Sequence, residues 1–151
     1  MIALADESAT EALGCRIGKS IRAGDFIALD GELGAGKTSL VRGIARGLGI
    51  DPLVVTSPTF VTMQVYSGGR MPLVHIDVWR LKDCQELETI GWNDLIRGGS
   101  SVIIVEWAQK IEPALPNSRL SIRLQVVASV DGLAPATRAA YINDQRDFPP
   151  T

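Results

Sequence analysis

The first thirty residues contain two segments whose apolar residues follow different periods. Ser8 to Glu11 has the Ser-x-x-Glu form of a capping box, and apolar residues continue at helical spacing, which predicts a helix over residues 8–22. After the Gly24-Asp25 turn, the run Phe26–Leu29 is wholly apolar. A run without polar residues is typical of a parallel strand covered on both faces, so we expect this segment near the centre of a sheet.

A second amphipathic pattern and three β-rich stretches follow. Apolar residues recur at helical spacing from Lys37 to Gly49, where the glycine is a suitable terminator. Beyond it, the stretches Leu53–Thr56, Phe60–Tyr66 and Leu73–Val78 are rich in residues that favour strands. We expect them to form a local antiparallel ribbon.

The second half of the chain predicts one helix and two more strands. Asp83–Arg97 has a helical pattern with an interruption at Gly91, and Val102–Val105 is a second buried apolar run. Arg119–Val127 alternates apolar and polar residues, which predicts a strand with one face in water. Together these segments predict one α/β domain over residues 1–143, followed by a frayed tail over residues 144–151.

Composition narrows the class of protein. The 151 residues are 46% hydrophobic and 21% charged, which is enough apolar material for a real core. The net charge of -2 argues against a broad positive field for nucleic acid, so any nucleic acid should be met through a partner. Cys15 and Cys84 have neither a zinc spacing nor a disulfide framework. We find no apolar run long enough for a membrane span and no secretory signal, so we expect a cytoplasmic protein without a membrane.

The segment Gly31–Thr38, GELGAGKT, satisfies the phosphate-loop motif G-x-x-x-x-G-K-[ST] at every fixed position. Its glycines allow successive backbone N–H groups to turn inward around a phosphate, and Lys37 supplies a positive charge for the β and γ phosphates. Thr38 offers a hydroxyl to magnesium. The motif follows a buried strand and opens a helix, which is the context it requires. We therefore expect a nucleotide site in a P-loop NTPase-like fold, with a mixed, mostly parallel central sheet flanked by helices and an antiparallel extension.

Two carboxylates end apolar strands, where a nucleotide hydrolase needs them. Glu106 follows the second buried run and would bind magnesium or orient the attacking water, although a solvent-facing strand end is the plainer alternative. Asp77 ends another apolar run and is a second candidate for the metal or the water, or an ion-pair partner of Arg80. His75 shares a face with Asp77 and more often would be a packed histidine than a base.

A further polar segment, Thr56–Thr59, places hydroxyls beside a proline, where a loop senses a γ phosphate in GTPases. A plain turn explains the segment almost as well. The sequence has neither an N-K-x-D nor a D-x-x-G motif, so ATP is favoured over GTP.

These motifs, in this order, resemble the TsaE family of P-loop ATPases in bacterial tRNA threonylcarbamoyladenosine synthesis. Besides the N-terminal segment Ser8–Gly14 and the phosphate loop, the resemblance rests on Ser57–Phe60, the His-x-Asp segment His75–Arg80 and the pair Glu106-Trp107. It spans roughly residues 7–140. Within the His-x-Asp segment a tryptophan stands where the family usually has tyrosine.

The resemblance implies a set of site residues. It implies ATP and magnesium as cofactors, with catalytic roles for Lys37, Glu106 and Asp77. The residues implied to contact ATP are Thr10, Gly34, Ala35, Gly36, Lys37, Thr38 and Arg138, of which Thr10 and Arg138 would serve the adenine. Thr38 and Glu106 would serve magnesium, and Thr59 would lie in a switch-like loop.

The resemblance also implies a partner, the TsaD–TsaB heterodimer, which transfers the threonylcarbamoyl group to tRNA while this subunit hydrolyses ATP. Two other readings stay open. A P-loop small-molecule kinase has a similar size, but it usually carries an arginine-bearing lid, whereas Arg119 and Arg123 lie on an alternating strand. A nucleotide-gated binding module would take part of its catalytic site from a partner.

Overall fold

The computed structural model describes residues 1–56, 63–129 and 137–146. The helices are α1 (Glu7–Ser20), α2 (Lys37–Leu48) and α3 (Trp92–Gly98), and the 3₁₀ segments are η1 (Pro52–Val54), η2 (Cys84–Ile90) and η3 (Ala108–Ala114). The strands are β1 (Ile2–Leu4), β2 (Phe26–Gly31), β3 (Met63–Tyr66), β4 (Leu73–Asp77), β5 (Val102–Glu106), β6 (Leu120–Val127) and β7 (Thr137–Asp144).

Within this described part, seven strands form one sheet in the order β1-β7-β6-β2-β5-β4-β3. The four central strands β6, β2, β5 and β4 are parallel, whereas β7 and β1 at one side and β3 at the other add antiparallel pairs. The predicted mixed sheet with a parallel centre and an antiparallel extension is confirmed. Because β2 and β5 are parallel neighbours, the carboxyl ends of the strands that contain the two predicted apolar runs meet at one edge.

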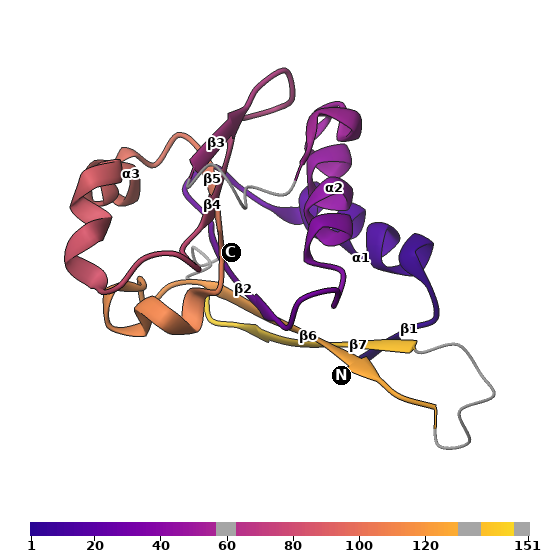
Figure 1. Cartoon of the computed structure of the whole chain (residues 1–151). Helices are drawn as coiled ribbons and strands as arrows, with labels where there is room; N and C mark the ends of the chain where they lie inside the picture. Colours follow the sequence, from indigo (N-terminus) through magenta and orange to yellow (C-terminus); the bar gives the residue numbers. More distant parts are fainter. Residues whose placement is uncertain (57–62, 130–136, 147–151) are drawn as a thin grey trace.

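Helices cover both faces of the sheet, as Figure 1 shows. Apolar side chains of one face, such as Leu29 and Ile104, pack with α1 and α2, while those of the other face, such as Ala28 and Ile103, pack with η2, α3 and η3. Alternate residues of one strand thus serve two cores, which is why the central runs contain no polar position.

Helices α1 and α2 approach each other through glycines. A Cβ added to Gly14 would lie 2.3 Å from the carbonyl oxygen of Leu40, and one added to Gly43 would lie 2.2 Å from that of Glu11. Gly18 and the nearby Gly47 are equally close to the facing backbone. Only glycine permits such a close contact, and the contact holds the start of α1 beside the start of α2.

The predicted helices are confirmed with small shifts. Helix α1 begins one residue earlier than expected, because Asp6 is its N-cap and accepts from the Ala9 backbone N–H at 2.8 Å. Helix α2 ends where the sequence places its terminator, since Gly49 adopts a φ of 82°. The interruption at Gly91 separates η2 from α3, and Gly91 has a φ of 73°.

Three expectations are wrong or incomplete. The segment Leu53–Thr56 is not a strand: its start belongs to η1, where the Asp51 side chain accepts from the Leu53 N–H at 3.0 Å. The strands β1 and β7 and the segment η3 were not predicted. The frayed tail expected from Asp144 is wrong for its first three residues, because Asp144 ends β7 and Arg146 pairs with Asp25 and Asp144. The hairpin of β3 and β4 confirms the predicted ribbon from Met63 onward, and residues 60–62 lie outside the described part of the chain.

Candidate functional site

The Gly31–Thr38 loop connects β2 to α2 at the carboxyl edge of the parallel strands. Gly34 and Gly36 have φ values of 81° and 102°, which residues with a Cβ rarely adopt. Between them, the Ala35 side chain is buried and its N–H donates to the Glu32 carbonyl oxygen at 3.1 Å. The two glycine conformations turn the backbone into the cradle that the motif predicts, with the N-terminus of α2 at its end.

Lys37 is folded back over its own loop. Its Nζ donates to the Gly31 carbonyl oxygen, lies 3.4 Å from the Glu32 carbonyl oxygen, and lies 4.0 Å from the centroid of the Trp107 ring. Burial lowers the pKa of the Lys37 ammonium, against the opposing effect of Glu106 and Asp77. The ammonium is thus held where a phosphate oxygen would offer it a stronger partner than carbonyl groups do.

Glu106 and Asp77 lie side by side at the ends of β5 and β4. They are register partners on adjacent parallel strands, and both side chains are buried, Glu106 with only 2% of its surface exposed. The Trp79 N–H donates to Asp77 Oδ1 at 2.8 Å. Burial, together with the nearby Glu106, raises the pKa of the Asp77 carboxyl. The solvent-facing alternative for Glu106 is excluded by its burial, and the structure brings both predicted carboxylates within electrostatic reach of Lys37.

A magnesium ion could be held only with help from a nucleotide and water. The described residues include no group of three or more His, Cys, Asp or Glu side chains that could hold a metal. The fitting donors are the hydroxyl of Thr38 at the start of α2 and the buried carboxylate of Glu106 at the end of β5. One hydroxyl and one carboxylate, completed by phosphates and water, match the few protein ligands that magnesium usually takes.

Thr10 and Arg138 flank the loop from two sides. A Cβ at Gly36 would lie 3.6 Å from Thr10 Cγ2 and 3.4 Å from Arg138 Cδ. The Arg138 Nη2 donates to the Gly34 carbonyl oxygen at 3.3 Å, while Arg138 Nε is buried without a partner. Thr10 is fully buried, and its hydroxyl donates to the Asp6 carbonyl oxygen. Strand β7 and helix α1 thus place Arg138 and Thr10 beside the phosphate loop, and these are the two residues that the family resemblance implies for the adenine.

Some functional features were not predicted, and one prediction lies outside the described residues. Thr59 belongs to residues 57–62, which the structure does not describe. Sequence reasoning gave no role to Trp107, which has a left-handed φ of 59° and packs against Trp79 at 4.4 Å between ring centroids. It also missed Asp30, whose pKa is raised by burial against the opposing effect of the nearby Lys37. The available signals were a tryptophan directly after the strand-end carboxylate and an aspartate directly before the loop.

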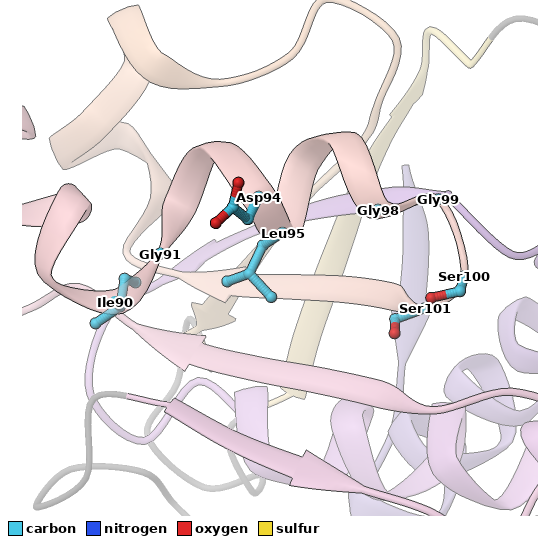
Figure 2. Close-up of a pocket in the computed structure, with 8 residues that line it drawn as sticks. All are labelled: Ile90, Gly91, Asp94, Leu95, Gly98, Gly99, Ser100 and Ser101. Atoms are coloured by element: carbon cyan, nitrogen blue, oxygen red, sulfur yellow. The ribbon is translucent and has the colours of Figure 1, made fainter.

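Two cavities differ in their relation to this loop. One of about 510 Å³ adjoins it and is lined in part by Asp30, Glu32 and Trp107. The other, about 350 Å³, lies between α3 and the turn into β5, with Leu95 and Ser101 in its wall (Figure 2). Because Ser101 precedes β5 and Glu106 ends it, the second cavity lies at the opposite end of the sheet from the phosphate loop.

Comparison with known proteins shows the family to which the chain is related. The family model described as "Threonylcarbamoyl adenosine biosynthesis protein TsaE" matches residues 4–131. The chain belongs to the TsaE family. The family takes part in the biosynthesis of threonylcarbamoyladenosine in tRNA, and the resemblance of the motifs is thereby confirmed.

Relatives in the TsaE family are similar over most of this chain. The TsaE protein of Bacillus subtilis is 46% identical over 99 residues, which are 66% of this chain and 60% of that protein. The TsaE protein of Streptomyces coelicolor is 44% identical over 115 residues, 74% of this chain and 76% of the relative. The chain thus aligns with less than two thirds of the Bacillus subtilis protein's length.

A solved structure shares the fold. The crystal structure of YdiB from Bacillus subtilis superposes with a TM-score of 0.71 at 30% identity, covering 93% of this chain and 82% of that one. In the described part of the chain, no helix has the length and apolar character needed to cross a membrane.

Proposed function

We propose that this TsaE-family chain binds ATP with magnesium, hydrolyses it, and works with the TsaD–TsaB heterodimer in tRNA modification, where hydrolysis sustains or resets turnover. The observation that carries the proposal is the meeting of the glycine-shaped loop, the Lys37 ammonium and the two buried carboxylates Glu106 and Asp77 at one edge of the sheet. A strand-to-helix turn without a nucleotide would have no need for a buried lysine beside two buried acids.

The loop would bind the phosphates through its backbone. The N–H groups from Gly34 to Thr38 and the N-terminus of α2 would donate to phosphate oxygens. The Lys37 Nζ would exchange the carbonyl oxygen of Gly31 for the β and γ phosphates, which carry full charge. Arg138 and Thr10, held against Gly36, would border the adenosine end of the nucleotide.

The carboxylates would serve the reaction itself. Thr38 and Glu106 would hold magnesium, which supplies charge neutralisation for the transferred phosphoryl group. Asp77 would orient the attacking water and accept its proton, a role that its raised pKa favours because a more basic carboxylate is a better proton acceptor. The Trp79 N–H bond to Asp77 Oδ1 leaves the second oxygen of Asp77 for that water.

Two features favour this proposal over a small-molecule kinase. Arg119, a lid candidate by residue type, lies directly before β6 and pairs with Glu112 at 2.5 Å. Arg123 lies within β6 and stacks on the Tyr141 ring at 5.0 Å. Arginines fixed to a strand in this way do not close over a phosphate as a lid arginine does.

Hydrolysis by the purified chain tests the chemistry directly. Free phosphate should be released from ATP in the presence of magnesium, and Lys37→Ala or Glu106→Ala should abolish the release. The exposed residues Lys82 and Glu88 provide matched controls, since Lys82→Ala and Glu88→Ala should keep the rate of the unmodified chain. Turnover at that rate in Lys37→Ala or Glu106→Ala would refute the assigned chemistry, and phosphate on an added acceptor would favour the kinase.

A further inference from the structure

A fully buried histidine touches the candidate magnesium carboxylate without forming a hydrogen bond. His75 lies in β4 with 0% of its surface exposed, and its Nε2 lies 3.4 Å from Glu106 Oε1. The register pairs Asp77 with Glu106 and His75 with Ile104, so the imidazole and both carboxylates share one face of the sheet. Leu73 and Ile104, on that same face, belong to the core that packs with α1 and α2.

The atoms on both sides of this contact are unpartnered. Among the described residues, neither His75 nitrogen has a hydrogen-bond partner, and neither does Glu106 Oε1. The imidazole lies beside the Tyr66 ring, with 6.2 Å between the two ring centroids. An unpaired buried polar group costs about 1–3 kcal/mol, a cost that an apolar side chain at this position would avoid. Among the described residues, a bond from His75 Nε2 to Glu106 Oε1 would remove this cost for both of those atoms.

We propose that His75 is a positioning residue that orients Glu106. Its imidazole donates from Nε2 to Glu106 Oε1, which leaves the other carboxylate oxygen for the magnesium that Glu106 and Thr38 would hold. The present separation of 3.4 Å is a few tenths of an ångström longer than an ordinary N–H···O bond, so a small side-chain rotation closes it. Outer partners of this kind fix the orientation of metal-ligating groups. The part of the inference that concerns magnesium rests on the proposed function. The contact between His75 and Glu106 does not depend on it.

The contact can be tested without any nucleotide, because His75 is the one histidine in the sequence. Nitrogen-15 NMR of the imidazole should show the Nε2–H tautomer, and Glu106→Gln should shift the Nε2 signal. The exposed Glu88 gives the matched control, since Glu88→Gln should leave that signal in place. An Nδ1–H tautomer, or an Nε2 signal that ignores Glu106→Gln, would overturn the inference.

The positioning role is tested by the magnesium dependence of nucleotide binding. With a fluorescent ATP analogue, the half-saturating magnesium concentration should rise about 10-fold in His75→Leu, as for other losses of an outer partner. His75→Gln places an amide N–H near the Nε2 position and should restore a value close to that of the unmodified chain. Binding in EDTA should be equal in all three proteins, which a merely structural defect would not allow.

The outcomes separate the two proposals. Equal magnesium dependence in His75→Leu and in the unmodified chain overturns the positioning role while the proposed function stands. An unmodified chain that binds the analogue without any effect of magnesium contradicts the proposed function, and the NMR comparison still decides whether His75 donates to Glu106. The NMR comparison also decides if His75→Leu does not fold, because it leaves His75 in place.

Discussion

The glycine contact between α1 and α2 makes Gly43→Ala a sensitive test of how the site is supported. The added Cβ would lie 2.2 Å from the Glu11 carbonyl oxygen and 2.9 Å from Gly14 Cα, whereas ordinary contacts begin near 3.4 Å. Both neighbours are backbone atoms, so no side chain can rotate away. One helix must therefore move by about 1 Å, and overpacking of this kind costs about 1–3 kcal/mol.

The net effect on stability combines this cost with a gain. Alanine is favoured over glycine in a helix by about 1 kcal/mol, but the close backbone contact places the cost at the upper end of its range. We expect Gly43→Ala to lower the free energy of unfolding by about 2 kcal/mol. For a chain of this length that corresponds to a melting temperature lower by about 4–8 °C.

Urea denaturation of Gly43→Ala and Gly98→Ala provides the comparison. Gly98 lies in α3, is exposed, and has no atom within 4 Å of an added Cβ. Gly98→Ala should therefore keep or raise the stability of the unmodified chain. Because α1 carries Thr10 against the phosphate loop, Gly43→Ala should also weaken ATP binding. A Gly43→Ala protein as stable as the unmodified chain would refute the reasoning about the helix contact.

Three further predictions concern the loop and the end of β7. Gly34→Ala should lower the free energy of unfolding by about 1–2 kcal/mol through its φ of 81° alone, as measured by urea denaturation, since nothing crowds the added Cβ. Arg138→Met removes the donor to the Gly34 carbonyl oxygen. Calorimetric titration should show a dissociation constant for ATP raised about 3–10-fold, which corresponds to one lost hydrogen bond. Unchanged binding would place Arg138 outside the site. The hydrogen bond from Arg146 lowers the pKa of the Asp144 carboxyl in the folded state below its value in the unfolded chain. The stability lost in Asp144→Asn should therefore be constant above the unfolded pKa and shrink as the pH falls through the folded pKa. A pH-independent difference between the melting curves of the two proteins would contradict this.

The local parts of the fold could be predicted from the sequence. The strand, loop and helix around Lys37 are encoded by adjacent residues: an apolar run, glycines at fixed spacing, and an amphipathic repeat ending at Gly49. Membership of the TsaE family followed from motifs whose order and spacing are visible in the chain. The segment at Pro52 shows the limit of composition, because a side-chain cap from Asp51 overrides a β-rich stretch.

The contacts within the site could not be predicted in the same way. Strand β7 carries Arg138 to the phosphate loop because it pairs with β6 on one side and, on the other, with β1, which is distant in sequence. The contact between His75 and Glu106 depends on the register of β4 against β5, and the packing of Lys37 on Trp107 depends on the left-handed turn after β5. Pairing, register and turn geometry of this kind are fixed by the whole fold rather than by local pattern.

The most direct test of the central claim is the rate of phosphate release from ATP by the purified chain, alone and with its cognate TsaD–TsaB pair, with Glu106→Ala as the control. The account predicts weak release alone, strong stimulation by the pair, and loss of both in Glu106→Ala. Equal rates with and without TsaD–TsaB, or stimulation that survives Glu106→Ala, would contradict a partner-dependent ATPase built on the Gly31–Thr38 loop and Glu106.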